Sequence, residues 1–393
     1  MSAPLGATER AALVATRRDL HAHPELAFEE RRTAALVADR LEAAGYRPRR
    51  GVGGTGVLAD LDGAAPGPTI LLRADMDALP LVEEGDVPYA STAPGRMHAC
   101  GHDGHTAALL ACAERLAARR GALRGRVRLC FQPAEEGRGG AERVIAEGAL
   151  DGVDACFGVH LWTELDVGLI GLAVGPVMAA VDRFEAVIEG QGGHGAIPHQ
   201  TRDPIVAAAH VVTALQSIVA RTVSPLDTAV VTVARLAAGE EGSWNIIPRV
   251  ARLSGTARAY AEDTWAALPG RIEQVVRGVA EALGCRATLE YERICAATVN
   301  EPAMTDLARA VARDLLGPEA VRTDGDGVRT LAGEDFSAFL RRVPGCFAFV
   351  GGRNAARGLV HPHHSPRFDF DEDALEHAAR LLEGVALRYL GAW

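Results

Sequence analysis

Three consecutive stretches decide the fold: TILLRADM at residues 69–76, an alanine-rich run at residues 106–120, and RVRLCFQP at residues 126–133. The first and third are apolar runs of strand length, and the run between them has high helix propensity. A strand, a helix and a second apolar strand in succession indicate helices packed on a largely parallel sheet. We therefore predict an α/β fold around this segment.

The flanking sequence extends this pattern in both directions. Apolar residues at helical spacing over residues 8–45 predict two helices, and the proline of HAHPELAF ends the first. GVLADL at residues 56–61 predicts another strand. Toward the end of the chain we predict a helix at residues 302–316, a strand at residues 346–352 and an amphipathic helix at residues 372–390.

The middle of the chain has a different order of elements. From residue 179 to residue 290 the pattern predicts strand, helix, strand, strand, helix and strand, with helices at residues 204–221 and 263–283. Two helices and four strands in this order are typical of a compact α+β, ferredoxin-like sandwich. We therefore predict one domain formed by residues 1–178 and 291–393, interrupted by an inserted domain at residues 179–290.

Length, composition and charge restrict the classes of function. The 393 residues exceed one ordinary domain of about 100 to 200 residues, which favours two domains. Hydrophobic residues make up 48% and charged residues 23%, the balance of a globular protein. The net charge of -10, without any cluster of positive charge, argues against a nucleic-acid partner.

The cysteines and the N-terminus suggest a compartment. The first residues do not have the pattern of a signal peptide, and we expect no apolar window long enough to span a membrane. Seven cysteines without paired spacing favour a reducing compartment over a disulfide framework. We therefore predict a cytoplasmic protein with free thiols and no membrane partner.

The segment MHACGHDGHT at residues 97–106 carries the densest chemical signal. Cys100 and His102 stand two residues apart before the alanine-rich helix, so that a thiolate and an imidazole can bind one divalent cation. The N-terminus of that helix would help to hold Cys100 deprotonated. The alternative interpretation is a polar turn that caps the helix through Asp103.

Two adjacent glutamates follow the strand at residues 126–133. Adjacent side chains diverge, so one of Glu135 and Glu136 can bind a metal while the other serves as general base. The residues alone leave open which glutamate does which. A solvated loop is the alternative, although ligands of α/β folds gather at the ends of such strands.

Further histidines complete a possible ligand set. His160 ends the apolar run CFGVHLW, where a hydrogen-bonded core histidine is the alternative. His361, His363 and His364 fall within LVHPHHSPRFDF, and their clustering favours metal binding. Together these segments supply donors for one or two divalent ions and leave one carboxylate as a base, a combination that suits hydrolysis.

Other catalytic motifs are absent from the sequence. It has no GxSxG elbow and no Walker loop, and we interpret GVGGTG at residues 51–56, which leads into a predicted strand, as a turn. Serine hydrolase, phosphate-loop and dinucleotide-binding interpretations therefore lack their required parts.

Ten ordered motifs make the chain resemble the M20 peptidase superfamily, specifically its subfamily D amidohydrolases. That group includes hippurate hydrolases, N-acyl-amino-acid amidohydrolases and auxin-conjugate hydrolases. The resemblance implies a zinc-peptidase-like catalytic domain and makes the inserted domain a lid, generally used for dimerisation. The motifs are RRDLHAHPELAFEE, RADMDALP, MHACGHDGHTA, FQPAEEG, GVHLW, GGHGAIPH, NIIP, GTAR, GEDFS and HHSPRFDFDE.

The resemblance also implies roles for individual residues. Asp77 resembles the aspartate that orients a metal ligand, with a turn cap as the alternative. In the lid, His194 resembles a histidine that polarises the scissile carbonyl, often from the partner subunit, while Asn245 and Arg258 match positions that bind the substrate carboxylate. The resemblance makes Glu135 the general base, and the implied metal ligands are Cys100, His102, Glu136, His160 and His364.

The activity implied by the resemblance is metal-dependent hydrolysis of N-acyl-L-amino acids to a carboxylic acid and a free amino acid. The expected cofactor is one or two divalent ions of zinc, manganese, cobalt or nickel, and the expected assembly is a homodimer or a small homo-oligomer. The alternatives are a dipeptidase or aminopeptidase of the same superfamily, and an inactive metal-binding homologue. The presence of Glu135 argues against the inactive homologue.

Overall fold

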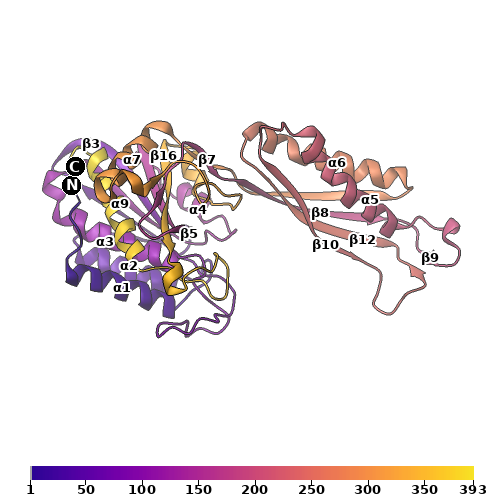
Figure 1. Cartoon of the computed structure of the whole chain (residues 1–393), viewed down its shortest axis with the longest axis horizontal. Helices are drawn as coiled ribbons and strands as arrows, with labels where there is room; N and C mark the ends of the chain where they lie inside the picture. Colours follow the sequence, from indigo (N-terminus) through magenta and orange to yellow (C-terminus); the bar gives the residue numbers. More distant parts are fainter. Residues whose placement is uncertain (1) are drawn as a thin grey trace. The chain divides into compact units, whose positions relative to one another are not determined.

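The structure, a computed structural model, describes residues 2–393, which fold into two compact units. Unit 1 contains residues 2–177, Thr298–Thr330 and Asp335–Trp393, and unit 2 contains Met178–Ala297 and Leu331–Glu334. Figure 1 shows unit 2 in the pink to orange of the middle of the chain. The predicted boundary at residue 290 is wrong, because it cuts strand β13 (Arg286–Cys295), which pairs along its length within unit 2.

Unit 1 is built on an eight-stranded mixed sheet. Its central strands β4, β3, β5 and β16 are parallel to one another, and β1 and β2 pair antiparallel with their neighbours. Strand β6 pairs antiparallel with β16 and parallel with β15. The predicted, largely parallel central sheet is confirmed. In spatial order the strands are β1 (Arg49–Val52), β2 (Gly56–Asp62), β4 (Arg124–Gln132), β3 (Ala65–Asp75), β5 (Ala155–Asp166), β16 (Gly345–Arg353), β6 (Ile170–Gly171) and β15 (Val321–Arg322).

Helices pack against this sheet. Helix α3 contacts α1, α2 and α9 and is buried on nearly all sides, as expected for an alanine-rich core helix. Ser2 hydrogen-bonds with Glu383 of α9, so the two ends of the chain lie side by side (Figure 1). The helices of unit 1 are α1 (Ala7–Ala22), α2 (Arg31–Ala43), α3 (His102–Ala118), α4 (Gly140–Ala146), α7 (Pro302–Leu316), α8 (Ser337–Leu340) and α9 (Asp373–Tyr389).

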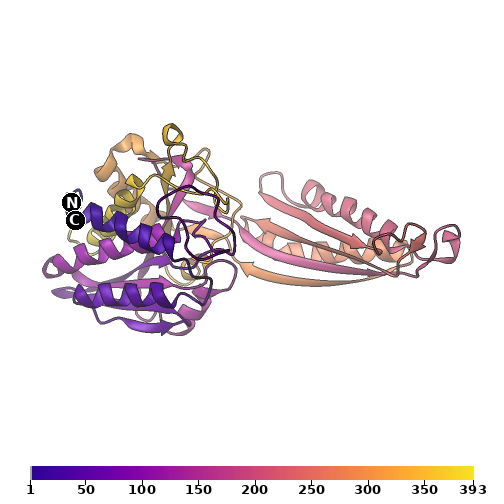
Figure 2. The same ribbon diagram turned by 90° about the horizontal axis from the view of Figure 1, so that it is seen from below.

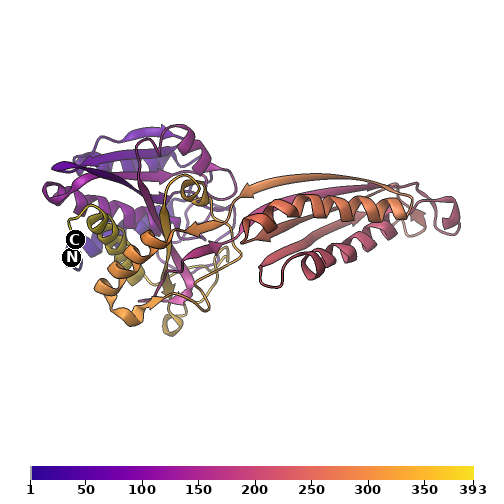
Figure 3. The same ribbon diagram turned by 90° about the horizontal axis from the view of Figure 1, so that it is seen from above.

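Unit 2 has the predicted order of two helices and four main strands. Helices α5 (Pro204–Ser217) and α6 (Glu262–Ala282) cover one face of an antiparallel sheet (Figure 3), and no helix covers the opposite face in the described chain (Figure 2). A small ribbon of β9 (Gly193–His194) and β11 (Ile246–Ile247) is attached. In spatial order the main strands are β10 (Ala229–Ala238), β12 (Val250–Ala259), β8 (Ala180–Glu189) and β13.

Helix α5 corrects one expectation. Together with the π-helical turn Ile218–Thr222 it forms the 19-residue segment Pro204–Thr222. This segment has a mean hydropathy of 1.4 and is long and apolar enough, by length and composition alone, to cross a membrane. One side of the segment packs into the hydrophobic core of unit 2. The outer side also carries apolar residues, including Ile205 and Val206. The helix itself was predicted at residues 204–221, but its continuation of apolar residues around the outer side was not expected.

Candidate active site

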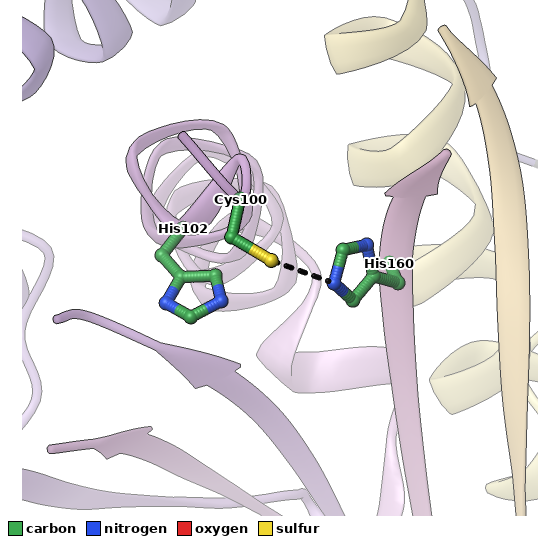
Figure 4. A group of neighbouring side chains, drawn as sticks. All are labelled: Cys100, His102 and His160. Carbon is green, nitrogen blue, oxygen red and sulfur yellow. Dashed lines mark hydrogen bonds between the residues drawn. The ribbon is translucent and has the colours of Figure 1, made fainter. Parts of the chain in front are cut away.

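Cys100, His102 and His160 converge within unit 1. Cys100 lies in the loop before α3, His102 is the first residue of α3, and His160 lies on β5. Figure 4 shows the sulfur of Cys100 directed at the ring of His160, whose Nε2 is 3.6 Å from Sγ. One donor atom of each residue lies within 4.8 Å of the other two. The structure thus places His160, also a predicted ligand, beside the Cys100–His102 pair.

Two glycines allow this convergence. Gly101 has a φ of 88°, in the left-handed region that favours glycine, and turns the chain between the two donors. A Cβ on Gly104 would stand 2.4 Å from Cδ1 of Leu161 on β5. The start of α3 can therefore lie directly against β5, next to His160.

Asp77 holds the turn that presents the two glutamates. Its carboxylate accepts hydrogen bonds from the backbone N–H groups of Glu135 at 2.9 Å and Glu136 at 3.1 Å. Its carbonyl accepts a hydrogen bond from Nδ1 of His102 at 2.8 Å. Ala134, which precedes the glutamates, has an unusual φ of 55°, and such strained residues cluster at functional sites. Asp77 therefore both caps a turn and contacts a candidate ligand.

Glu136 and His364 extend the cluster. Oε1 of Glu136 lies 3.2 Å from Nε2 of His364, and both residues group with Cys100 within 4.8 Å. A third group joins His102, Glu135 and Glu136. Because the three groups share members, the site has donors for two neighbouring cations with common ligands.

The three C-terminal histidines differ in their surroundings. The buried Nε2 of His363 donates to the carbonyl of Leu161 at 2.9 Å, and its ring stacks on Trp162 with 4.5 Å between centroids. His364 instead faces Glu136 and adopts a φ of 64°. Within residues 2–393, His361 belongs to none of the donor groups. The geometry thus favours His364 over His363 as a ligand.

The electrostatics of the cluster are dominated by negative charge. Burial and neighbouring carboxylates, Glu136 foremost, raise the pKa of the Cys100 thiol well above its usual range. Burial lowers the pKa of His102, but the charge of Asp75 and other carboxylates raises it to about 10. Without a bound cation, burial and these carboxylates therefore oppose ionisation of Cys100, whereas a bound cation would favour the thiolate.

The donor set fits a divalent cation. Nε2 of His102 is buried and has no hydrogen-bond partner among the described residues, while its Nδ1 is held by Asp77. A buried polar atom without a partner is unfavourable unless it binds something. Thiolate, imidazole and carboxylate together suit zinc, manganese, cobalt or nickel, and a cation would relieve the excess negative charge.

Two of the predicted substrate-binding residues lie together in unit 2. His194 pairs with Ile246 in the β9–β11 ribbon, and the carbonyl of Asn245 accepts a hydrogen bond from N–H of Gly195 at 2.8 Å. Nδ1 of His194 accepts a hydrogen bond from N–H of Ala196 at 3.0 Å. The proton of the neutral ring is therefore on Nε2, which can donate to a ligand.

Arg258 lies on β12 of the four-stranded sheet, at the end away from the β9–β11 ribbon. It pairs with Val181, at the start of β8, and its Nη1 donates to the carbonyl of Leu331 at 2.5 Å. Asn245 lies beyond the other end of β12, before Val250. At about 3.3 Å per residue, the eight residues from Val250 to Arg258 span about 25 Å. One chain thus does not bring Arg258 together with His194 and Asn245.

The sequence interpretation assigned no role to Arg73, Asp75 and His105, although all three are buried near the cluster. A signal was present, because two opposite charges interrupt the apolar strand TILLRADM. Charged residues are rarely buried unless they are paired.

Residues 71–388 match the model of peptidase family M20/M25/M40. N-acetyl-L-cysteine deacetylase of Bacillus subtilis is 41% identical, over 96% of this chain and 88% of that protein. IAA-amino acid hydrolase ILR1-like 4 of Arabidopsis thaliana is 40% identical, over 96% and 86%. The crystal structure of Bacillus subtilis YXEP, described as a dinuclear metal binding peptidase from the M20 family, has a TM-score of 0.85 and 36% identity, over 99% of this chain and all of that one. The chain therefore belongs to peptidase family M20/M25/M40.

Proposed function

We propose that this protein is a metal-dependent amidohydrolase that cleaves the amide bond of N-acyl-L-amino acids, releasing a carboxylic acid and a free amino acid. Relatives named for N-acetyl-L-cysteine and for IAA-amino acids support this substrate class, because each compound carries an acyl group on an amino-acid nitrogen. The observation that carries the proposal is the convergence of donor groups beside Glu135. The proposed ligands are Cys100, His102, Glu136, His160 and His364.

Bound divalent ions, of zinc, manganese, cobalt or nickel, supply Lewis acidity that polarises the scissile carbonyl and lowers the pKa of water. Glu135 takes the proton from the attacking water and returns it to the departing amine. Its backbone is held by Asp77, and its Oε1 accepts a hydrogen bond from N–H of Asp335 at 3.3 Å. Glu135 is thus fixed beside the ligands at both its backbone and its carboxylate.

Residues of unit 2 complete the proposed mechanism. Nε2 of His194 donates to the developing oxyanion, while Asn245 and Arg258 bind the free carboxylate of the substrate. An N-acyl amino acid is roughly 10 Å long, about three residues of extended chain. One substrate therefore does not reach both ends of a sheet about 25 Å long. We infer that His194 and Asn245 of one copy act on the substrate of a second copy.

The edge strand β10 supports a homodimer. It carries a single charged residue, Arg235, whereas the opposite edge strand β13 carries several acidic and basic residues. Exposed edges are normally protected from pairing by such charges. Helix α5 packs beside β10, and its Ile205 and Val206 are 42% and 47% exposed. Antiparallel pairing of β10 with its copy would form one continuous sheet and bury this face.

We also propose that the protein works in the cytoplasm, without nucleic-acid or membrane partners. All seven cysteines are free, and most are buried, as suits a reducing compartment. The negative net charge disfavours nucleic-acid binding.

The test is a hydrolysis screen with defined metals. Chelator-treated protein is reloaded separately with zinc, manganese, cobalt or nickel, and amino-acid release is measured from benzoyl-glycine, from N-acetyl amino acids and from unblocked dipeptides. We expect release from the N-acyl compounds and its loss on chelation. Turnover of unblocked dipeptides alone would instead identify a dipeptidase, and the absence of turnover with every metal an inactive homologue.

A further inference from the structure

Three buried charged or polar side chains form a hydrogen-bonded chain beside the proposed ligands. Nη1 of Arg73 donates to Oδ2 of Asp75 at 2.5 Å, and Nδ1 of His105 donates to Oδ1 of Asp75 at 2.6 Å. None of the three is more than 1% exposed. None is a proposed ligand or a proposed contact of the substrate.

One end of this chain holds the backbone of Leu161, the residue that follows His160. Nε2 of His105 accepts a hydrogen bond from N–H of Leu161 at 2.9 Å, and the carbonyl of Leu161 accepts one from Nδ1 of His160 at 2.7 Å. Because a carbonyl only accepts, Nδ1 of His160 carries a proton and the neutral ring keeps a lone pair on Nε2. That Nε2 faces Sγ of Cys100 (Figure 4).

The other end of the chain reaches the proposed general base. Nε of Arg73 donates to Gln132 at 2.9 Å, and its Nη2 donates to Oδ1 of Asp335 at 3.0 Å. The backbone N–H of Asp335 in turn donates to Glu135. A single buried network thus connects Glu135 with His160.

We propose that Arg73, Asp75 and His105 are positioning residues that set the ring orientation and tautomer of His160 relative to Glu135. This inference rests on the proposed metal-dependent hydrolysis. A buried Arg–Asp pair is a weak source of stability compared with apolar packing. Its rigid geometry, in contrast, suits the orientation of a ligand, and changes to partners of this kind typically weaken metal binding about 10-fold to 100-fold.

Two substitutions of His105 separate this role from simple packing. His105→Asn keeps an N–H near the place of Nδ1 but leaves N–H of Leu161 without its acceptor, whereas His105→Gln can place an oxygen near Nε2. Cobalt affinity is measured by chelator competition, together with the visible spectrum of the cobalt protein and thermal unfolding in chelator. We expect His105→Asn to bind cobalt about 10-fold to 100-fold more weakly, with shifted bands, and His105→Gln to regain much of the affinity.

The matched control is His377→Asn, on the half-buried histidine of α9 outside the cluster, which should leave cobalt affinity unchanged. Wild-type affinity and spectrum in His105→Asn, with only a lower unfolding temperature, would overturn the inference. If His105→Asn does not fold, Arg73→Lys gives the same test, because it removes the fork that joins Asp75 to Asp335. Failure of the proposed function is seen separately, as absent hydrolysis by cobalt-loaded wild-type protein.

Discussion

Two regions present their functional side chains in opposite ways. One is the donor cluster of unit 1, formed by Cys100, His102, Glu136, His160 and His364, and the other is the tip of unit 2, formed by the β9–β11 ribbon with Trp244 and Asn245. His102 and His160 are 1% and 3% exposed and are fixed by backbone and side-chain hydrogen bonds. His194 is exposed at the β9–β11 ribbon, and the neighbouring Trp244 is 92% exposed. The first region is organised by its own chain, whereas the second displays groups that its own unit does not use.

The exposed side chain of Trp244 gives the tip of unit 2 an apolar surface that binding can bury. Burial of an aromatic side chain against a partner or substrate is favourable, and the costs of association offset much of that gain. Ile246, which pairs with His194 in the ribbon, is also apolar and is 59% exposed. An apolar surface next to a candidate functional histidine marks a binding surface. The exposed groups at the tip therefore support the proposal that His194 acts on the substrate of a second copy.

The largest effect is expected at the cluster. Glu135→Gln removes the proton acceptor while keeping the size of the side chain, so kcat for an N-acyl amino acid should fall by about 10³-fold or more. Metal content, measured by elemental analysis, should stay close to that of the wild type. Full activity of the variant would show that Glu135 is not the base.

The next effect concerns the tip. His194→Ala should lower kcat by about 10²-fold, because it removes a donor to the oxyanion. If His194 acts on a second copy, subunit exchange between His194→Ala and Glu135→Gln creates dimers with one intact site. Random exchange should then restore about a quarter of wild-type activity. A mixture that stays inactive after verified exchange would place His194 in the site of its own chain.

A smaller effect is expected from the outer face of α5. Val206→Glu introduces a charge into the proposed interface and should shift the protein toward monomers in light scattering, with activity at low concentration reduced about 10-fold. Val82→Glu is the control, since Val82 is 67% exposed in unit 1. A dimer that survives Val206→Glu would argue against the β10–α5 interface.

The smallest effect is expected at Trp244. Trp244→Ala should raise KM for benzoyl-glycine by about tenfold at most, with kcat nearly unchanged, because it removes apolar contact without touching the reacting atoms. Leu226→Ala is matched to it, since Leu226 is 94% exposed elsewhere in unit 2. Equal KM values for both variants and the wild type would show that Trp244 makes no contact that contributes to substrate binding.

The success of sequence interpretation differed between the two regions for physical reasons. Periodicity and helix propensity predicted α3, the parallel strands and the order of elements in unit 2, because these depend on local pattern. The boundary at residue 290 failed because the end of a strand depends on its partner strand. The apolar outer side of α5 was missed because no single stripe marked it.

The sequence by itself determined the α/β class and the alternation of elements, since residue type and spacing encode these properties. It also supplied the candidate donor side chains, although the choice of His160, Glu136 and His364 rested on the family resemblance. Only the tertiary structure decided which donors meet. His364 lies beside Glu136, whereas His363 donates a hydrogen bond to the carbonyl of Leu161. Asp77 accepts a hydrogen bond from the backbone of Glu135, and Arg258 lies far from His194. Those outcomes depend on strand register and on chain segments distant in sequence, which local patterns do not contain.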